Sequence, residues 1–263
     1  MSEDDKSLGA PSLNIVAPGV ALVSLERPQV LNALRPRDMI ALIDVFERLG
    51  MRDDVRSVVL TGSGRAFCAG GDLRALQKLT AKETHHYLAA YADLGDVISR
   101  IRFPVIAALN GLTFGGGLEL ACMADIRVAE PSTTLCAADV PHGLVPTGGL
   151  TWRLPRLIGH GRASWMMLSN ATVDADEAHR IGLCDLVAAD GAAVKASIQL
   201  ATQIAGFPPS GVAATVHALR LSARATLSVS AAFEIDANRR LLRDEGTRQR
   251  LDAVLSRPEP SSP

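Results

Sequence analysis

Residues 104–129 read PVIAALNGLTFGGGLELACMADIRVA and give the clearest indication of fold class. The apolar run at 105–109 is typical of a buried strand. Asn110-Gly111 then turns the chain toward three glycines at 115–117, which open a short apolar helix, and another strand is expected over 125–129. A strand, a helix and a strand in this order predict parallel strands joined by helical crossovers, which is an α/β arrangement.

The same alternation continues on both sides of this stretch. Pro36 is placed to begin a helix, and apolar residues recur after it at helical spacing up to a stop at Gly50. Thr80 and Glu83 fit a capping box, in which the hydroxyl and the carboxylate each bond a free backbone N–H at a helix start. A further helix is expected to begin at Asp174. The other expected strands are 13–16 and 20–25, joined as a hairpin, 57–60 and 183–187.

The character of the chain changes at Phe207-Pro208-Pro209, and no strand pattern occurs past about residue 190. We therefore expect an α/β core over 1–205, of which about 1–12 is a loose tail, and a helical C-terminal region over 206–263. The end of that region is rich in proline and serine and is expected to be disordered.

The overall composition excludes several classes of protein. The 263 residues are 48% hydrophobic and 21% charged, which is an ordinary globular balance and excludes disorder over most of the length. Nucleic-acid binding is not expected, because the net charge is −1 and phosphate binding needs a concentrated cationic surface. Aromatic residues make up only 4%, which argues against base-stacking platforms as well.

Targeting, membrane and metal signals are not found in the sequence. The acidic, polar N-terminus is the opposite of a signal peptide, and no apolar run approaches the roughly 18 residues that a membrane span needs. The cysteines include no Cys-x-x-Cys pair and the histidines show no metal-ligand spacing. We expect a soluble cytoplasmic protein with reduced, mostly buried thiols, no metal site and no membrane partner.

Three glycines at 115–117 and the acid that follows them form the first candidate site. Glycines at a helix start leave backbone N–H groups uncovered, and with the helix dipole these suit an anion or a developing oxyanion. Glu119 lies one turn into a helix that is apolar on nearly every side, so burial should raise its pKa. Tight strand-to-helix packing would equally explain the glycines, and a buried basic group or a neighbouring subunit could satisfy the acid.

Two further segments are weaker candidates by themselves. The small residues of Arg65-Ala66-Phe67-Cys68-Ala69-Gly70-Gly71-Asp72-Leu73 would let a ligand approach the backbone closely, and Asp72 could cap the helix that follows. Asp139 stands near a Pro-Gly turn, where an acid is more often a turn former than a catalyst.

Together these segments resemble the enoyl-CoA hydratase/isomerase (crotonase) superfamily. The similarity covers most of residues 20–190 in order and with matching spacing. It is carried by Leu25-Glu26-Arg27-Pro28 with Asn32-Ala33-Leu34, Arg65–Leu73, Pro104–Ala129, Gly143-Leu144-Val145-Pro146, Arg153-Leu154-Pro155 with Ile158-Gly159, and Glu177-Ala178 to Gly182-Leu183.

The resemblance implies a spiral of ββα repeats with a helical C-terminal trimerisation region, in homotrimers that often pair into homohexamers. It implies an acyl-CoA substrate, with coenzyme A present as part of that substrate and no separate cofactor. Gly71 and Gly116 match the positions whose amides hold the thioester oxygen, and Glu119 and Asp139 match the two acids of the hydratases. The implied substrate-binding residues are Arg27, Arg65, Ala69, Gly70, Asp72, Leu73 and Arg74.

The implied activity is enoyl-CoA hydration, the addition of water across the 2,3 double bond of an enoyl thioester, as in fatty acid metabolism. Asp139 departs from the family pattern, which has glutamate at this position. Gln29 stands where the family often has lysine, and Arg250 and Ala253 replace its usual C-terminal phenylalanine and lysine. The alternatives are an enoyl-CoA isomerase, another acyl-CoA lyase or hydrolase of this family, and a non-catalytic CoA-binding trimer.

Overall fold

A six-stranded sheet forms the middle of the first part of the computed structural model, which describes residues 9–255. Its hairpin of β1 and β2 is antiparallel, and every later neighbour is parallel, with Val59 opposite Ile106 and Ala107 opposite Arg127. The predicted hairpin and the predicted parallel strands are therefore confirmed. In order across the sheet the strands are β1 (Ser12–Ala17), β2 (Val20–Leu25), β3 (Ser57–Gly62), β5 (Val105–Leu109), β7 (Ile126–Ala129) and β10 (Leu186–Val187).

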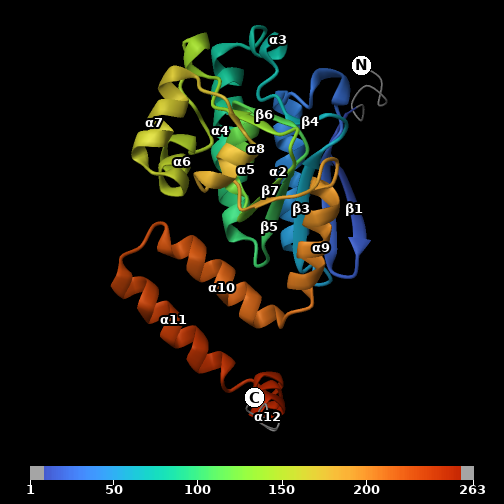
Figure 1. Ribbon diagram of the computed structural model, residues 1–263, viewed down its shortest axis with the longest axis vertical. Helices are drawn as coiled ribbons and strands as arrows, with labels where there is room; N and C mark the ends of the chain where they lie inside the picture. Colours follow the sequence, from blue (N-terminus) through green and yellow to red (C-terminus); the bar gives the residue numbers. More distant parts are fainter. Residues whose placement is uncertain (1–8, 256–263) are drawn as a thin grey trace. The chain divides into compact units, whose positions relative to one another are not determined.

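A second sheet of four short strands accompanies the first. Its strands are β4 (Ala66–Cys68), β6 (Leu112–Phe114), β8 (Thr134–Cys136) and β9 (Val173–Asp174). The chain passes from β3 to β4, from β5 to β6 and from β7 to β8, each time from the large sheet to the small one and then into helix (Figure 1). This succession is the predicted spiral of ββα repeats. The short strands themselves were not predicted, because three residues are too few to show a period of two.

Helices follow each pair of strands and also make up the C-terminal part. Those up to residue 205 are α2 (Pro36–Gly50), α3 (Leu73–Leu76), α4 (Ala81–Arg100), α5 (Gly116–Met123), α6 (Leu150–Ile158), α7 (His160–Ser169), α8 (Ala175–Arg180) and α9 (Ala193–Ala205), with short 3-10 helices η1 (Pro28–Val30) and η2 (Val140–His142). The helix at Pro36–Gly50 has the predicted bounds, and Thr80 and Glu83 form the predicted capping box.

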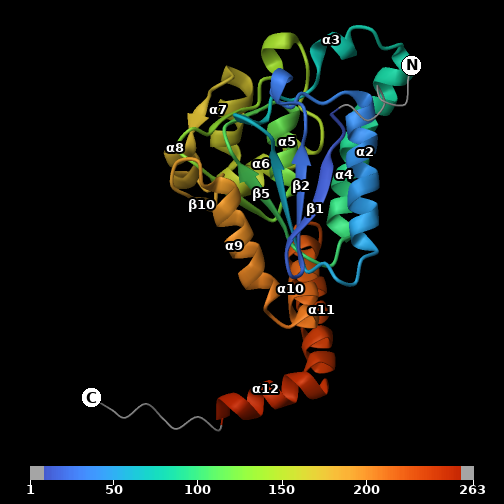
Figure 2. The ribbon, with the colours of Figure 1, turned by 90° about the vertical axis from the view of Figure 1, so that its right-hand side faces the viewer.

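Both faces of the large sheet are covered by helices, and every residue of its central strands β3 and β5 is therefore buried. Val58 and Leu60 point into the main core with α2 and α4, while Val59 points to the opposite face. On that face Val59, Ile106 and Val128 lie in a smaller cluster with α9 (Figure 2). Because β3 and β5 are parallel, their carboxyl ends lie at the same edge of the sheet, and from this edge β5 leads through β6 into α5.

The strand predicted at 183–187 is shorter than expected. The amides of Leu183 and Cys184 both bond the carbonyl of Ala178 at the end of α8, and pairing with β7 starts only at Leu186. Leu183 and Cys184, the first residues of the predicted strand, therefore belong to the turn that ends α8. All the cysteines, at 68, 122, 136 and 184, are buried free thiols.

The described chain divides into two compact units after Phe207. The amides of Gly206 and Phe207 bond carbonyls of α9, so these two residues continue the first unit beyond the boundary expected at 205. The second unit contains α10 (Pro209–Ser222), α11 (Leu227–Leu241) and α12 (Glu245–Leu255). Most of the expected loose tail, and all of the expected disordered end over 257–263, lie outside the described residues. Among the described helices none is long and apolar enough to cross a membrane.

Candidate active site

A pocket of about 370 Å³ lies where the loop before α3, the start of α5 and the segment 138–147 meet. Side chains of α4 close it from one side. The pocket combines backbone of the two glycine-containing loops with two acids, and the residues that carry its chemistry are Gly70, Gly71, Gly116, Glu119, Asp139 and Thr147.

The two glycine loops meet at van der Waals distance. A Cβ atom on Gly70, whose φ is +93°, would lie 2.8 Å from the Phe114 carbonyl oxygen and 3.0 Å from the Gly116 amide nitrogen. No other residue type fits such an approach, so glycine at 70 is required for the loops to come together. Sequence alone gives the glycines but not this contact between segments more than 40 residues apart.

Pairing with Leu34 fixes the direction of the Gly71 amide. The Leu34 amide donates to the Gly70 carbonyl at 2.7 Å, and the Asp72 amide donates to the Leu34 carbonyl at 2.9 Å. This is an isolated parallel bridge between Leu34 and Gly71, in which the N–H of Gly71 itself faces away from Leu34. Gly116 is the first residue of α5, so its N–H has no carbonyl one turn earlier to bond. Both glycines line the pocket.

Glu119 is the most buried acid of the pocket, with 1% of its surface exposed. The Thr147 amide donates to its Oε1, and the Thr147 hydroxyl donates to its Oε2 at 2.8 Å. Burial raises the pKa of Glu119 to about 7, the charge of Asp139 adds to this, and the bonds from Thr147 oppose it. The predicted upward shift of this pKa thus has its predicted cause. The sequence suggested that a buried basic group or a neighbouring subunit would satisfy the Glu119 carboxylate. The neutral residue Thr147 supplies these hydrogen bonds instead.

Asp139 faces the same pocket from just before η2. Burial raises the pKa of Asp139 to about 6, against the opposing effect of His142. Its Oδ2 atom is buried and has no hydrogen-bond partner within the described residues. A buried carboxyl oxygen without a partner is costly unless a ligand or a proton satisfies it. The two acids therefore form a pair that carries about one proton between about pH 6 and 7.

The raised pKa of Glu119 predicts how stability depends on pH. Because the folded-state pKa of about 7 exceeds the ordinary value of 4.5, the folded chain binds the proton more tightly than the unfolded chain. The stabilisation is complete below pH 4.5 and is lost as the pH rises toward about 7, by about 3 kcal/mol. Glu119→Gln lacks this titration. Urea unfolding across this pH range should show wild type losing stability relative to Glu119→Gln, and a constant difference would contradict the raised pKa.

The other residues implied by the family resemblance divide into two groups. Ala69, Gly70 and Leu73 line the pocket. Arg27 and Asp72 are bonded to each other at 3.1 Å and are not among the lining residues. Arg27 also donates to the Ala33 carbonyl at 2.6 Å, and Asp72 accepts from the Ala75 amide at 3.2 Å as the N-cap of α3. These contacts hold the Gly71 loop against the η1 region, so Arg27 and Asp72 have a structural role.

Two exposed arginines stand outside the lining. Arg65 lies in the turn before β4, and Arg74 lies on α3. Substrate contacts by these arginines remain a prediction. The described residues contain no group of three or more His, Cys, Asp or Glu side chains that could hold a metal ion.

Several pocket residues were not singled out from the sequence. Thr147 carries no local sign of its role, and its bonds to Glu119 span 28 positions. Tyr87 and Tyr91 are buried residues of α4, and both also line the pocket. Their spacing of four residues with a polar atom on each was the available signal. His142 gave no such signal.

Comparison with known proteins agrees with this geometry. The sequence profile of the enoyl-CoA hydratase/isomerase family matches residues 16–257. This chain belongs to the enoyl-CoA hydratase/isomerase family. YngF of Bacillus subtilis strain 168, which bears an enoyl-CoA hydratase/isomerase name, is 33% identical over 235 residues, 89% of this chain and 90% of that protein. EchA12 of Mycobacterium leprae, named a probable enoyl-CoA hydratase, is 39% identical over 219 residues, 79% of this chain and 73% of that protein.

Solved crotonase-type structures superimpose on nearly the whole chain. An enoyl-CoA hydratase from Bacillus anthracis has a TM-score of 0.89 at 28% identity and covers 93% of this chain and 95% of its own. DspI from Pseudomonas aeruginosa has a TM-score of 0.89 at 29% identity and covers 96% of each chain. The predicted crotonase fold is therefore confirmed.

Proposed function

We propose that this member of the family is an enoyl-CoA hydratase. The observation that carries the proposal is that two carboxyl groups, Glu119 and Asp139, line one pocket with two glycine amides. A single acid suffices to move a double bond, whereas adding water needs one group to take a proton from water and another to give one to carbon. An acyl-CoA thioester is the substrate, and coenzyme A enters only as part of it.

The amides of Gly71 and Gly116 would bind the thioester oxygen. As hydroxide adds to C3, the electron pair of the double bond moves toward that oxygen, and fixed N–H donors stabilise the charge without reorganising. Each such donor contributes about 3 kcal/mol in other oxyanion holes. Glu119 takes the proton of the water, and Asp139 delivers a proton to C2. One O–H bond of water and the C2–C3 π bond break while C–O and C–H bonds form. The acid pair gains one proton from water and gives one to C2, so it ends with the same number of protons.

The hydrogen bonding of the two acids supports this division of work. Thr147 donates to both oxygens of Glu119, which favours its ionised form, whereas the buried Oδ2 of Asp139 accepts from no donor within the described residues, which favours its protonated form. The higher pKa belongs to Glu119, so the shared proton rests mainly on Glu119 before substrate binds. Hydration with the proposed roles requires this proton to pass from Glu119 to Asp139 when water and the thioester bind.

An acyl-CoA panel tests the proposed reaction. Purified protein is given 2-enoyl-CoA and 3-enoyl-CoA thioesters of increasing chain length, and the absorbance of the conjugated enoyl thioester is followed. Hydration predicts loss of this absorbance with 2-enoyl substrates. A rise in absorbance with 3-enoyl substrates alone would identify an isomerase. Binding without any turnover would identify a non-catalytic CoA-binding protein.

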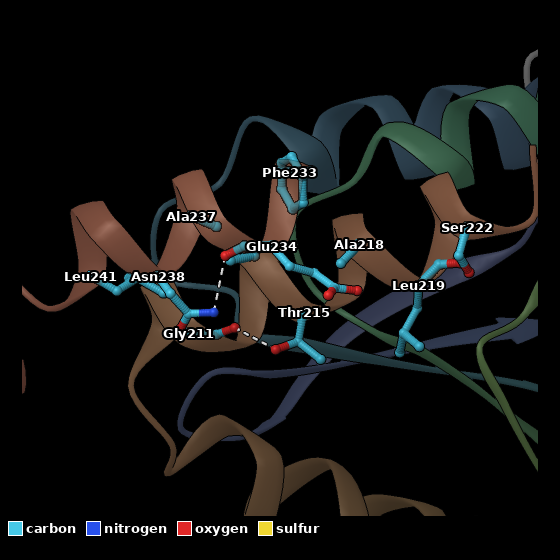
Figure 3. Close-up of a pocket in the computed structure, with 11 residues that line it drawn as sticks. Gly211, Thr215, Ala218, Leu219, Ser222, Phe233, Glu234, Ala237, Asn238 and Leu241 are labelled. Carbon is cyan, nitrogen blue, oxygen red and sulfur yellow. Dashed lines mark hydrogen bonds between the residues drawn. The ribbon is translucent and has the colours of Figure 1, made fainter. Parts of the chain in front are cut away.

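We also propose that the chain assembles into homotrimers, alone or paired into hexamers. In the second unit α10 and α11 pack together, with the rings of His217 and Phe233 4.8 Å apart. Between them lies a groove of about 440 Å³, lined by residues such as Ala218, Phe233 and Ala237 (Figure 3). Large apolar side chains on these helices remain exposed, among them Leu219, Leu227 and Ile235. Such a surface is typical of an interface, and the family resemblance suggests the trimer.

Replacing Ile235 with glutamate tests this assembly. Ile235 is 70% exposed on α11, so a charge there costs the isolated chain little but would be buried and unpaired in an interface. Sedimentation velocity should show a trimer or hexamer for wild type and a monomer for Ile235→Glu. Ala92→Glu, which places the same charge on an exposed position of α4, is the matched control. A monomeric wild type would contradict the proposal.

A further inference from the structure

The only two tyrosines of the chain, Tyr87 and Tyr91, lie one helical turn apart on α4 and both line the pocket. They are 3% and 2% exposed. Their rings pack edge to face with centroids 5.5 Å apart, and their hydroxyl oxygens are 3.0 Å apart. Phenylalanine would fill the same core volume without burying polar atoms, so the two hydroxyls need a separate explanation.

The hydrogen bonds of the two hydroxyls run in one direction. Tyr87 donates to the Leu34 carbonyl at 3.0 Å. A phenol has a single proton, so the bond between the two hydroxyls must be donated by Tyr91 to the oxygen of Tyr87. The Leu34 carbonyl is also the acceptor for the Asp72 amide in the bridge that orients Gly71. The chain Tyr91 to Tyr87 to Leu34 thus ties α4 to the loop that carries Gly71.

Each hydroxyl also lies against one of the two glycines. A Cβ atom on Gly71 would stand 3.0 Å from the Tyr87 hydroxyl, and one on Gly116 would stand 2.4 Å from the Tyr91 hydroxyl. The pair therefore touches both loops at the two glycines that line the pocket. Burial raises the pKa of both tyrosines, so both hydroxyls stay protonated and keep these bonds across the working pH range.

We propose that Tyr87 and Tyr91 are positioning residues, which hold the Gly71 and Gly116 amides in the geometry that polarises the thioester carbonyl. This inference rests on the proposed function of the pocket. Oxyanion stabilisation depends on donors that are already in place, and small displacements of such groups are expensive. Loss of the Tyr87 hydroxyl removes the side-chain bond to Leu34 and leaves the Tyr91 hydroxyl without its acceptor. Loss of the Tyr91 hydroxyl leaves the bond from Tyr87 to Leu34 intact. It removes only the bond between the two hydroxyls and the contact of the Tyr91 hydroxyl with Gly116.

The test is Tyr87→Phe, measured by turnover and by a spectrum that needs no turnover. For crotonyl-CoA hydration we expect kcat to fall about tenfold or more while KM stays nearly unchanged. The second measurement uses an enoyl-CoA conjugated to an electron-rich aromatic ring, whose absorption maximum moves to longer wavelength when its carbonyl is polarised. Wild type should show this shift on binding, Tyr91→Phe a smaller one, and Tyr87→Phe the smallest.

Thr61→Val is the matched control, because Thr61 is a buried residue whose hydroxyl donates to the Ala108 carbonyl at 3.0 Å and which does not line the pocket. It should keep both kcat and the spectral shift. An unchanged shift in Tyr87→Phe, with wild type showing one, overturns the inference and leaves the proposed function standing. If wild type binds the probe without a shift, the proposed oxyanion site itself is wrong. If Tyr87→Phe does not fold, Tyr91→Phe decides, and a wild-type shift there overturns the inference.

Discussion

Replacing Glu119 with glutamine is expected to slow crotonyl-CoA hydration about 1,000-fold, within the range for removal of a general base. The substitution preserves shape: the amide oxygen still accepts from the Thr147 backbone, and the Thr147 hydroxyl can turn to accept from the new NH₂ group. The variant should therefore fold and bind substrate, and lose only the ability to take a proton from water. Initial rates at saturating crotonyl-CoA, followed at the enoyl absorbance, measure the effect.

Glu130→Gln is the matched control for this variant. Glu130 is also a buried carboxyl, and it accepts from Ser132 at 2.9 Å and from the Ala193 amide at 3.1 Å outside the pocket. It should hydrate crotonyl-CoA at the wild-type rate, which separates the loss of the Glu119 base from the general cost of changing a buried acid. Undiminished hydration by Glu119→Gln would refute the assignment of the base.

Replacing Asp139 with asparagine is expected to slow hydration about 100-fold. Asparagine keeps the size of the side chain but cannot deliver a proton to C2. The distinguishing measurement is exchange of the C2 protons of a saturated acyl-CoA with deuterated water. Asp139→Asn should lose this exchange, because it needs the acid that works at C2, whereas Glu119→Gln should retain it, because no water is added.

The outcome for Asp139 has a clear threshold. A loss of less than about tenfold corresponds to less than 1.4 kcal/mol of barrier and would show that Asp139 is not required. Exchange that persists in Asp139→Asn and vanishes in Glu119→Gln would reverse the two roles. Asp174→Asn serves as the control, because Asp174 caps α8 away from the pocket and asparagine caps a helix equally well.

Local signals predicted the larger elements of the fold well. The helix at Pro36–Gly50 has both a proline start and a glycine stop, and the helix after Thr80 has a capping box at its start, so neighbouring residues specified these ends. The strands β3 and β5 were evident from apolar runs that are buried on both faces. The strands of the second sheet, which are two or three residues long, were missed, because their hydrogen-bond partners come from distant segments and they are too short to show a period.

The pocket could be predicted only in part. The glycines at 70, 71 and 116 stand out in the sequence, as does Glu119, an acid in an otherwise apolar helix. The family resemblance joins these residues to Asp139. The partner of Glu119 did not stand out, since Thr147 carries no local sign of its role. Arg27 was assigned to substrate by resemblance, yet its guanidinium is bonded to Asp72 and Ala33.

The order of apolar runs, glycines and caps was enough to establish an α/β chain with a helical C-terminal part, since these features act over a few residues. Which groups face one another depended on folding. The spiral carries Gly70 to within contact of Gly116 and encloses Glu119 away from water. That enclosure moves the pKa of Glu119 to about 7, because the cost of removing a charge from water depends on every segment that surrounds it.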